Sequence, residues 1–370
     1  MGLRTDLEHS VRQALNLTET EYYERLSLIL ADARRLRLIG VADGAMDLSL
    51  DHWHVPYWGE KLIGRYGYHC NGMMSRPFPG IHPLTAYDLT DGCFVLITPP
   101  PSSSADDAVD VTGLEGLSLC ERLGLKVESV RGDRGLSTVE FVKGDGLEGT
   151  TYYRGVKANS ILREHIRGRG WVENEETGER TCVRRNLDYH GVRTNLIALS
   201  KMDRNHPGRR RVFLFITNDD SRSDPFDLLD QYRMRGEHKR SLGCLSALGV
   251  KHLPSTESME EIAGHLLLFV KLQFLLKLFC ERFGIKRCEP KTLANLFFAR
   301  SGISWTDGSG SRKTTIIFSN RAAIRKFGRT RLNSGDGHGV VLIEQWRGHR
   351  KLRQQQSVEV SAGPPPAPPA

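Results

Sequence analysis

The stretch Tyr232-Arg-Met-Arg-Gly-Glu-His-Lys-Arg-Ser-Leu-Gly-Cys-Leu-Ser246 has the most informative spacing in the chain. Tyr232, Arg235, Lys239 and Ser246 follow one another at steps of three, four and seven residues. An α-helix turns by about 100° per residue, so these steps keep all four side chains on one face. The helix that the sequence predicts over 224–248 therefore presents an aromatic ring and two cations to one neighbouring surface.

A predicted strand upstream carries an aspartate in its middle. Residues 48–59 alternate large and polar side chains, which is typical of a β-strand, and Asp51 lies within this run. A buried strand seldom carries a carboxylate unless that group is paired or binds a metal ion. Asp51 is therefore a candidate metal ligand, with an aspartate at the turn of an edge strand as the alternative. Asp43 and Asp47 are assigned to the preceding turn.

A second aspartate follows another predicted strand. Residues 126–130 are predicted as a short strand that ends in Arg131-Gly-Asp-Arg-Gly135. Substrates usually meet an α/β sheet at the carboxyl ends of its strands. Asp133 is therefore the second candidate, with an ordinary β-turn aspartate beside glycine as the alternative.

These residues resemble a known family, the DDE transposases of bacterial insertion sequences. Tyr232 and Arg235 match the first half of its Tyr-Arg-Glu-Lys signature, in which the Glu would fall at Lys239 and the Lys at Ser246. The stretch Asp51-His-Trp-His-Val-Pro-Tyr-Trp-Gly59 is similar to the strand with the family's first catalytic Asp, Asp-x-x-x-Val/Ile-Pro-Tyr-x-Gly.

Two further stretches extend the resemblance. Asp133-Arg-Gly-Leu136 is similar to the family's Asp-Arg-Gly-Phe/Tyr motif, with Leu136 in place of the aromatic residue. Leu248-Gly-Val-Lys-His-Leu-Pro-Ser255 is similar to Leu-Gly-Leu-Asp-His-Leu-Pro-Ser. Each motif is weak alone, but together and in the right order they cover residues 45–320.

The resemblance implies a ribonuclease-H-like domain that cleaves and joins DNA strands with Mg²⁺ or Mn²⁺. Two such ions can hold the attacking and leaving oxygens at the phosphorus, and they require about three converging carboxylates. By resemblance, Asp51 and Asp133 are catalytic residues and metal ligands. Tyr232, Arg235 and Lys239 would contact the DNA backbone.

The third carboxylate is where this sequence departs from the family. Lys239 occupies its position, and an ammonium there would repel metal ions. Glu237 is the acidic residue nearby and the candidate for the third catalytic position. It stands two residues, roughly 200°, around the helix, so it points away unless a bulge at Gly236 re-registers the turn. Together with Ser246, Lys239 predicts that cleavage is impaired.

Strands and helices alternate along the chain, which predicts a mixed α/β sheet flanked by helices. The order along the chain is three strands, a helix, a strand, a helix, a strand, and then an inserted segment before a long helix. This is the layout of the ribonuclease-H-like fold that the resemblance implies. The predicted parts are an N-terminal helical region (1–44), a ribonuclease-H-like domain (45–285) with a β-rich insertion at 160–222, a basic C-terminal region (286–355) and a disordered Pro-rich tail (356–370).

Charge favours a polyanionic partner. The 370 residues carry a formal charge of +8, and residues 286–353 contain fifteen Lys and Arg against four acidic residues. Such an excess often marks nucleic-acid contact, with a solvated basic face as the alternative. The resemblance implies double-stranded DNA as the partner, at element ends and target, with a homodimer on DNA as one possible assembly.

Other protein classes are disfavoured. The seven cysteines form no CxxC pair, which disfavours a zinc site or a disulfide framework and favours a reducing compartment. The N-terminus has no apolar signal core, and the most apolar run, 265–280, is short for a bilayer and is interrupted by Lys271, Gln273 and Lys277. We therefore expect a cytoplasmic protein without a membrane span.

Three functions remain open from the sequence. The first is a DNA transposase of an insertion sequence with impaired catalysis, and the second is an inactive remnant that only binds DNA. The third is an unrelated basic α/β protein in which Asp51 and Asp133 are structural. Metal-dependent cleavage distinguishes the first two, and salt-dependent DNA binding separates both from the third.

Overall fold

The structure is a computed structural model of the 370-residue chain. It describes residues 14–40, 45–53, 55–56, 67–68, 78–99, 112–134, 136, 139–143, 149–203, 205–206, 208–247, 258–282, 303–308, 311–316 and 340–342. The chain forms two compact units, the first comprising Met1–Gly243 and Val250–Leu272, and the second comprising Cys244–Gly249 and Gln273–Ala370. All candidate site residues named above except Ser246 belong to the first unit.

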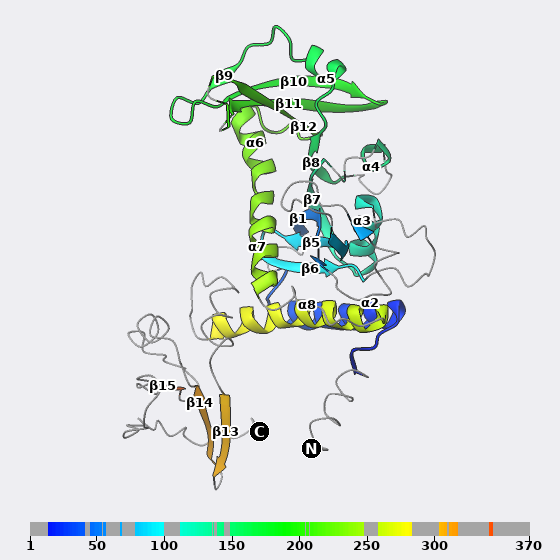
Figure 1. Ribbon diagram of the computed structural model, residues 1–370, viewed down its shortest axis with the longest axis vertical. Coiled ribbons are helices and arrows are strands. Elements are labelled where there is room, and N and C mark those ends of the chain that lie inside the picture. The colour runs from blue at the N-terminus through cyan, green and yellow to red at the C-terminus, as the bar shows by residue number, and fades with distance from the viewer. Residues whose placement is uncertain are drawn as a thin grey trace, which may run out of the picture. The chain divides into compact units, whose positions relative to one another are not determined.

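A nine-stranded mixed sheet forms the centre of the first unit, in the order β6-β5-β1-β7-β8-β12-β11-β10-β9 (Figure 1). Its strands are β1 (Ala45–His52), β5 (Leu84–Asp88), β6 (Cys93–Ile97), β7 (Lys126–Gly132), β8 (Thr151–Val156), β9 (Val172–Glu173), β10 (Arg180–Tyr189), β11 (Val192–Met202) and β12 (Arg210–Thr217). β7 pairs in parallel with β1 and with β8, and the other neighbouring pairs are antiparallel. The predicted mixed α/β architecture is therefore confirmed.

Helices and two small sheets complete the described part of the chain. The helices are α2 (Glu19–Arg35), α3 (Gly113–Arg122), α4 (Val139–Lys143), α5 (Ser160–Glu164), α6 (Pro225–Arg233), α7 (Arg235–Ala247) and α8 (Met259–Arg282). One small sheet contains β2 (Val55–Pro56), β3 (Gly67–Tyr68) and β4 (Phe78–Ile81). The other contains β13 (Ile303–Gly308), β14 (Ser311–Ile316) and β15 (Val340–Leu342). No helix in the described ranges is long and apolar enough to span a bilayer.

The two faces of the central sheet differ in chemistry. In β1, Ser49 and Asp51 point to α7, where they bond His238 and Arg235. Because side chains alternate along a strand, the neighbouring apolar residues point to the opposite face, which α3 covers on β5. There Gly116 of α3 comes so close that a Cβ would lie 2.2 Å from Leu84 Cδ2. Polar groups thus collect beneath α7, and on the other face of β1 and β5 the packing is apolar.

The turn predicted at Asp47 is wrong, because β1 already begins at Ala45. The Asp47 carboxylate accepts a hydrogen bond from the Ser129 hydroxyl and lies 3.5 Å from Arg131 Nη1 on the adjacent strand. Arg131 also donates to the Gln231 backbone oxygen at 2.8 Å and to its side-chain oxygen at 2.7 Å. The Asp47 carboxylate is tolerated in this strand because it pairs with the buried Arg131. The same guanidinium joins the sheet to α6.

The helix predicted over 224–248 is two helices in the structure. α6 ends at Arg233, α7 begins at Arg235, and Met234 lies between them. Past the junction, Glu237 N bonds Met234 O at 3.0 Å, a three-residue step that is tighter than an α-helical turn. Sequence periodicity does not detect this junction because Met234 keeps helical backbone angles.

The β-rich segment before α6 continues the central sheet, since β12 pairs with β8. Within the β-rich insertion predicted at 160–222, β11 and β12 form an antiparallel hairpin. The strand β10 is not predicted from the sequence, because residues 163–188 are charged and rich in glycine. The Pro-rich tail and most of the basic segment 286–353 lie outside the described residues.

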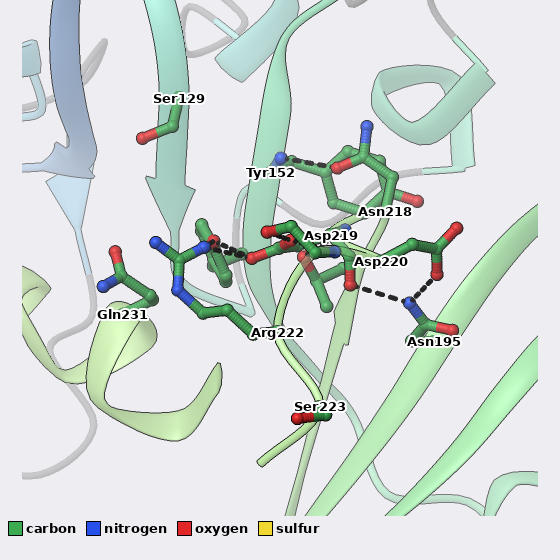
Figure 2. A network of polar contacts seen from close by, with 12 residues as sticks. Ser129, Tyr152, Asn195, Asn218, Asp219, Asp220, Arg222, Ser223 and Gln231 are labelled. Carbon is green, nitrogen blue, oxygen red and sulfur yellow. Dashed lines mark hydrogen bonds and ion pairs between the residues drawn. The ribbon is translucent and has the colours of Figure 1, made fainter. Parts of the chain in front are cut away.

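A polar network fixes the turn from β12 into α6 (Figure 2). The Asp219 carboxylate accepts hydrogen bonds from Tyr153 Oη at 2.5 Å, from Ser221 N at 2.9 Å and from Arg222 Nη1. Asn195 Nδ2 bonds the Asp219 backbone oxygen at 3.0 Å and Asp220 Oδ1 at 2.8 Å. Burial raises the pKa of Asp219, but the hydrogen bonds outweigh it and lower the pKa to about 2. The network therefore ties the start of α6 to β8 and β11.

Asp219→Asn should destabilise the protein, because an amide nitrogen would face the donors that now meet a carboxylate. A pKa lowered from 3.8 to about 2 corresponds to about 2 kcal/mol of stability. Since the pKa is depressed by folding, this stability is present above pH 3.8 and is lost as the pH falls through about 2. Denaturant unfolding at neutral and acidic pH measures both effects. The exposed Asp220→Asn, which keeps an acceptor for Asn195, is the control, and an equal loss there would contradict the assignment.

Candidate functional site

One guanidinium joins the two candidate carboxylates. Arg235 Nη2 lies 2.8 Å from Asp51 Oδ2 and 3.0 Å from Asp133 Oδ2. The two carboxylate oxygens can be no farther apart than the sum of these distances, 5.8 Å. Asp51 comes from β1, Asp133 follows β7, and these strands are parallel neighbours. The expected convergence of Asp51 and Asp133 is therefore present.

Lys239 lies one helical turn beyond Arg235 and faces Asp51. Its Nζ is 3.9 Å from Asp51 Oδ2, and its side chain is 56% exposed, against 10% for Arg235. Arg235 is thus held inside, whereas Lys239 reaches in from the solvent side. Burial raises the pKa of Asp51, and the charges of Arg235 and Lys239 oppose that shift.

Tyr232 brings its hydroxyl to the same place from the end of α6. Its ring packs against Phe215 with centroids 4.2 Å apart, and its Oη lies 3.5 Å from Arg235 Nη1. Gly155 of β8 leaves room for this hydroxyl, because a Cβ there would lie 2.9 Å from it. Tyr232, Arg235 and Lys239 therefore share one face, as their spacing predicts.

Glu237 does not reach the carboxylate pair. Its side chain is 52% exposed and lies 3.4 Å from Arg240 Nη2, one turn along the helix. The tighter turn at Met234 does not rotate it toward Asp51. The side chain of Ser246 lies outside the described part of the chain.

The side chains in this arrangement do not fit the expected pair of divalent cations. Both carboxylates are paired with Arg235, and the ammonium of Lys239 lies where a third acidic ligand would be needed. Among the described residues, no three His, Cys, Asp or Glu side chains gather closely enough to hold a metal ion. Two carboxylates and two cations instead form a neutral ion-pair cluster.

His238 anchors α7 beneath this cluster, and no sequence pattern singles it out. The ring is fully buried, with Nε2 2.9 Å from Thr85 Oγ1 and Nδ1 3.0 Å from Ser49 Oγ. The Thr85 hydroxyl donates to the Asp51 backbone oxygen at 2.7 Å, so we assign the ring proton to Nε2. Burial lowers the pKa of His238 to about 3, aided by the charges of Arg235 and Lys239. The imidazole is therefore neutral, and it holds the strand that carries Asp51.

A third buried guanidinium, after those of Arg131 and Arg235, lies on the opposite face of the sheet. Arg154 of β8 is 1% exposed, and its Cζ lies 3.5 Å from the Phe141 ring centroid. Its three nitrogens have no hydrogen-bond partner within the described ranges. Burial lowers the pKa of Arg154 to about 9, and Tyr152 and Asp133 oppose the shift. The sequence signal that could have identified Arg154 is a charged residue within an otherwise apolar strand, the same signal that identified Asp51.

A basic cleft of about 980 Å³ opens beside the ion-pair cluster. Asp133, Tyr232, Arg235 and Lys239 contribute to its wall, which continues along β11 and β12. Its acidic lining residues are Asp133 and Asp203, and its basic ones are Arg134, Arg163, Arg167, Lys201, Arg209, Arg210, Arg211, Arg233, Arg235 and Lys239. Five further acids outside the lining form ion pairs with these cations: Asp51, Glu164, Glu173, Glu179 and Asp230. Ten cations still exceed the seven acids, so the cleft keeps an excess of positive charge that attracts polyanions.

Comparison with known proteins gives no family assignment. No family model matches the chain, and no curated protein matches it either. The function therefore rests on the chemistry of the cluster and the cleft.

Arg235→Met should destabilise the fold by about 3 kcal/mol near neutral pH, because it leaves two adjacent carboxylates without their shared cation. Their repulsion raises the folded-state pKa of the pair, so protonation relieves the defect. The loss should therefore shrink as the pH falls toward about 5. Urea unfolding at a series of pH values measures this, with the more exposed Arg233→Met as the control. A loss that is independent of pH would contradict the shared ion pair.

Proposed function

We propose that this protein binds DNA in the basic cleft, as a transposase-type protein of an insertion sequence whose strand-cleaving site is impaired. The observation that carries the proposal is the excess of ten basic over two acidic side chains in one cleft that also contains Asp133, Arg235 and Lys239. Phosphate contacts by Lys and Arg supply most of the affinity of non-specific DNA binding.

The strand order supports a ribonuclease-H-like domain as the scaffold. Strands β6-β5-β1-β7-β8 form a sheet in which β5 is antiparallel to its neighbours and β1, β7 and β8 are parallel. This is the arrangement that the resemblance implies, and it would account for the meeting of Asp51 and Asp133 at the ends of adjacent parallel strands.

Impaired cleavage follows from the charges around the carboxylates. A metal-dependent site needs about three acidic ligands, and here Asp51 and Asp133 are neutralised by Arg235 and Lys239. The side chain of Glu237, the remaining acid of the signature stretch, interacts with Arg240 instead. The protein would then hold DNA at a site that cannot readily cut it.

An active Mg²⁺- or Mn²⁺-dependent transposase is the second candidate. The observation that favours it is the separation of at most 5.8 Å between the oxygens of Asp51 and Asp133, since catalytic metal pairs lie about 3.5–4 Å apart. In the third interpretation, an unrelated basic α/β protein, Asp51 and Asp133 only hold α7 against the sheet, and the cleft binds no nucleic acid.

Neutralising the cleft should weaken DNA binding and flatten its salt dependence. In the double variant Arg167→Gln/Lys201→Gln, the slope of log K against log salt should fall by about 0.9 for each phosphate that is no longer neutralised. Arg122→Gln/Lys126→Gln removes the same charge outside the cleft lining and should leave the slope unchanged. Fluorescence anisotropy of a labelled DNA duplex measures both. Equal effects of the two variants, or no salt-dependent binding by the wild type, would refute the proposal.

Lys239→Glu should restore part of a Mn²⁺-dependent nicking activity that is weak or absent in the wild type. The change removes a positive charge and supplies a carboxylate in the same place. Glu237→Gln, made in the same background, is the control and should have little effect because that side chain points away. Nicking of supercoiled DNA is the assay. Activity in the wild type that Glu237→Gln abolishes would make Glu237 the third ligand and favour the active transposase.

A further inference from the structure

We infer that Arg235 and Lys239 take over the charge-neutralising role of divalent cations, so that the protein holds a DNA phosphate beside Asp51 and Asp133 without any metal ion. This inference rests on the proposed DNA binding and specifies how that binding works at the carboxylate end of the cleft. It concerns the binding of phosphodiester backbone and no chemical step.

The charges of the cluster balance within the protein. Asp51 and Asp133 contribute two negative charges, and Arg235 and Lys239, which contact them at 2.8 to 3.9 Å, contribute two positive ones. Two carboxylates without those cations would repel a phosphate that approached along the cleft. With them, this end of the cleft presents no net negative charge to DNA.

The two cations are placed for different tasks. The Arg235 side chain is 10% exposed, and both carboxylates bond the same nitrogen of its guanidinium, so it stays with the acids. The Lys239 side chain is 56% exposed, lines the cleft and stands 3.9 Å from its carboxylate, which is longer than a close ion pair. An ammonium has three donors, so Lys239 can contact Asp51 and a backbone phosphate together.

His238 is neutral and lies next to the ion-pair cluster, between α7 and the sheet. Its two ring nitrogens are engaged by Thr85 and Ser49, and the ring adds no charge to the cluster. The balance within the cluster is therefore set by its four ionic groups, and the charge of Arg154 also acts on Asp133 from the opposite face of the sheet. Replacing the ammonium of Lys239 by a carboxylate changes the net charge of the cluster from zero to two negative charges.

The test compares DNA binding by the full chain in EDTA and in Mg²⁺, with fluorescence anisotropy of a labelled duplex. The wild type should bind equally well in both, apart from the general weakening that Mg²⁺ causes by competing for phosphates. Lys239→Glu should bind about tenfold more weakly in EDTA, and Mg²⁺ should recover most of that loss.

Lys201→Glu is the matched control, because it makes the same charge change in the same cleft away from the Asp51–Asp133 pair. It should weaken binding in both buffers with no recovery in Mg²⁺. Lys239→Gln, which adds no carboxylate, should show a smaller loss and a smaller recovery, and it serves if Lys239→Glu does not fold by circular dichroism.

Three results would overturn the inference: wild-type binding that EDTA abolishes, recovery in Mg²⁺ that is the same for Lys239→Glu and Lys201→Glu, or neither Lys239 variant differing from wild type. Each of these leaves the proposed DNA binding intact. Failure of the wild type to bind DNA in either buffer would instead refute the proposed function itself, so the two failures are distinguishable.

Discussion

The contact of one guanidinium with two carboxylates from different strands is the interaction on which the site depends. Arg235 begins α7 and bonds Asp51 and Asp133 from beneath that helix. Arg235 and Asp51 are buried and costly to desolvate, and each is tolerated because its partner is present. The ion pairs, with His238 and Arg131 on either side, therefore fix α6 and α7 against the sheet and define the wall of the cleft.

Polar contacts replace apolar packing where the helices cross the strands that bear Asp51 and Asp133. His238 bonds Ser49 and Thr85, and Arg131 bonds Gln231. Such contacts are directional, so they specify one register of helix on sheet more sharply than apolar contacts do. The same groups that a metal-dependent enzyme would keep available for ions are here engaged in holding the fold together. The proposed binding of DNA without cleavage is thus compatible with one stable structure.

Much of this arrangement was predictable from the sequence. The spacing of Tyr232, Arg235 and Lys239 predicts a shared helical face, and an aspartate inside the strand of Asp51 predicts a paired or ligated carboxylate. The junction at Met234 and the strand β10 were not predictable in this way. Helical backbone angles hide the first. The second is hidden because the register of β10 shifts between Arg184 and Leu187, so its buried and exposed residues do not alternate regularly.

The sequence by itself determined which side chains share a face, because periodicity along a helix or strand is local and is fixed by backbone geometry. It also determined the excess of positive charge. Only the tertiary structure decided that Arg235 pairs with both aspartates, that Glu237 turns to Arg240, and that basic residues from β7 to α7 line one cleft. These contacts join residues that are far apart in the chain, and no local pattern records the distances between them.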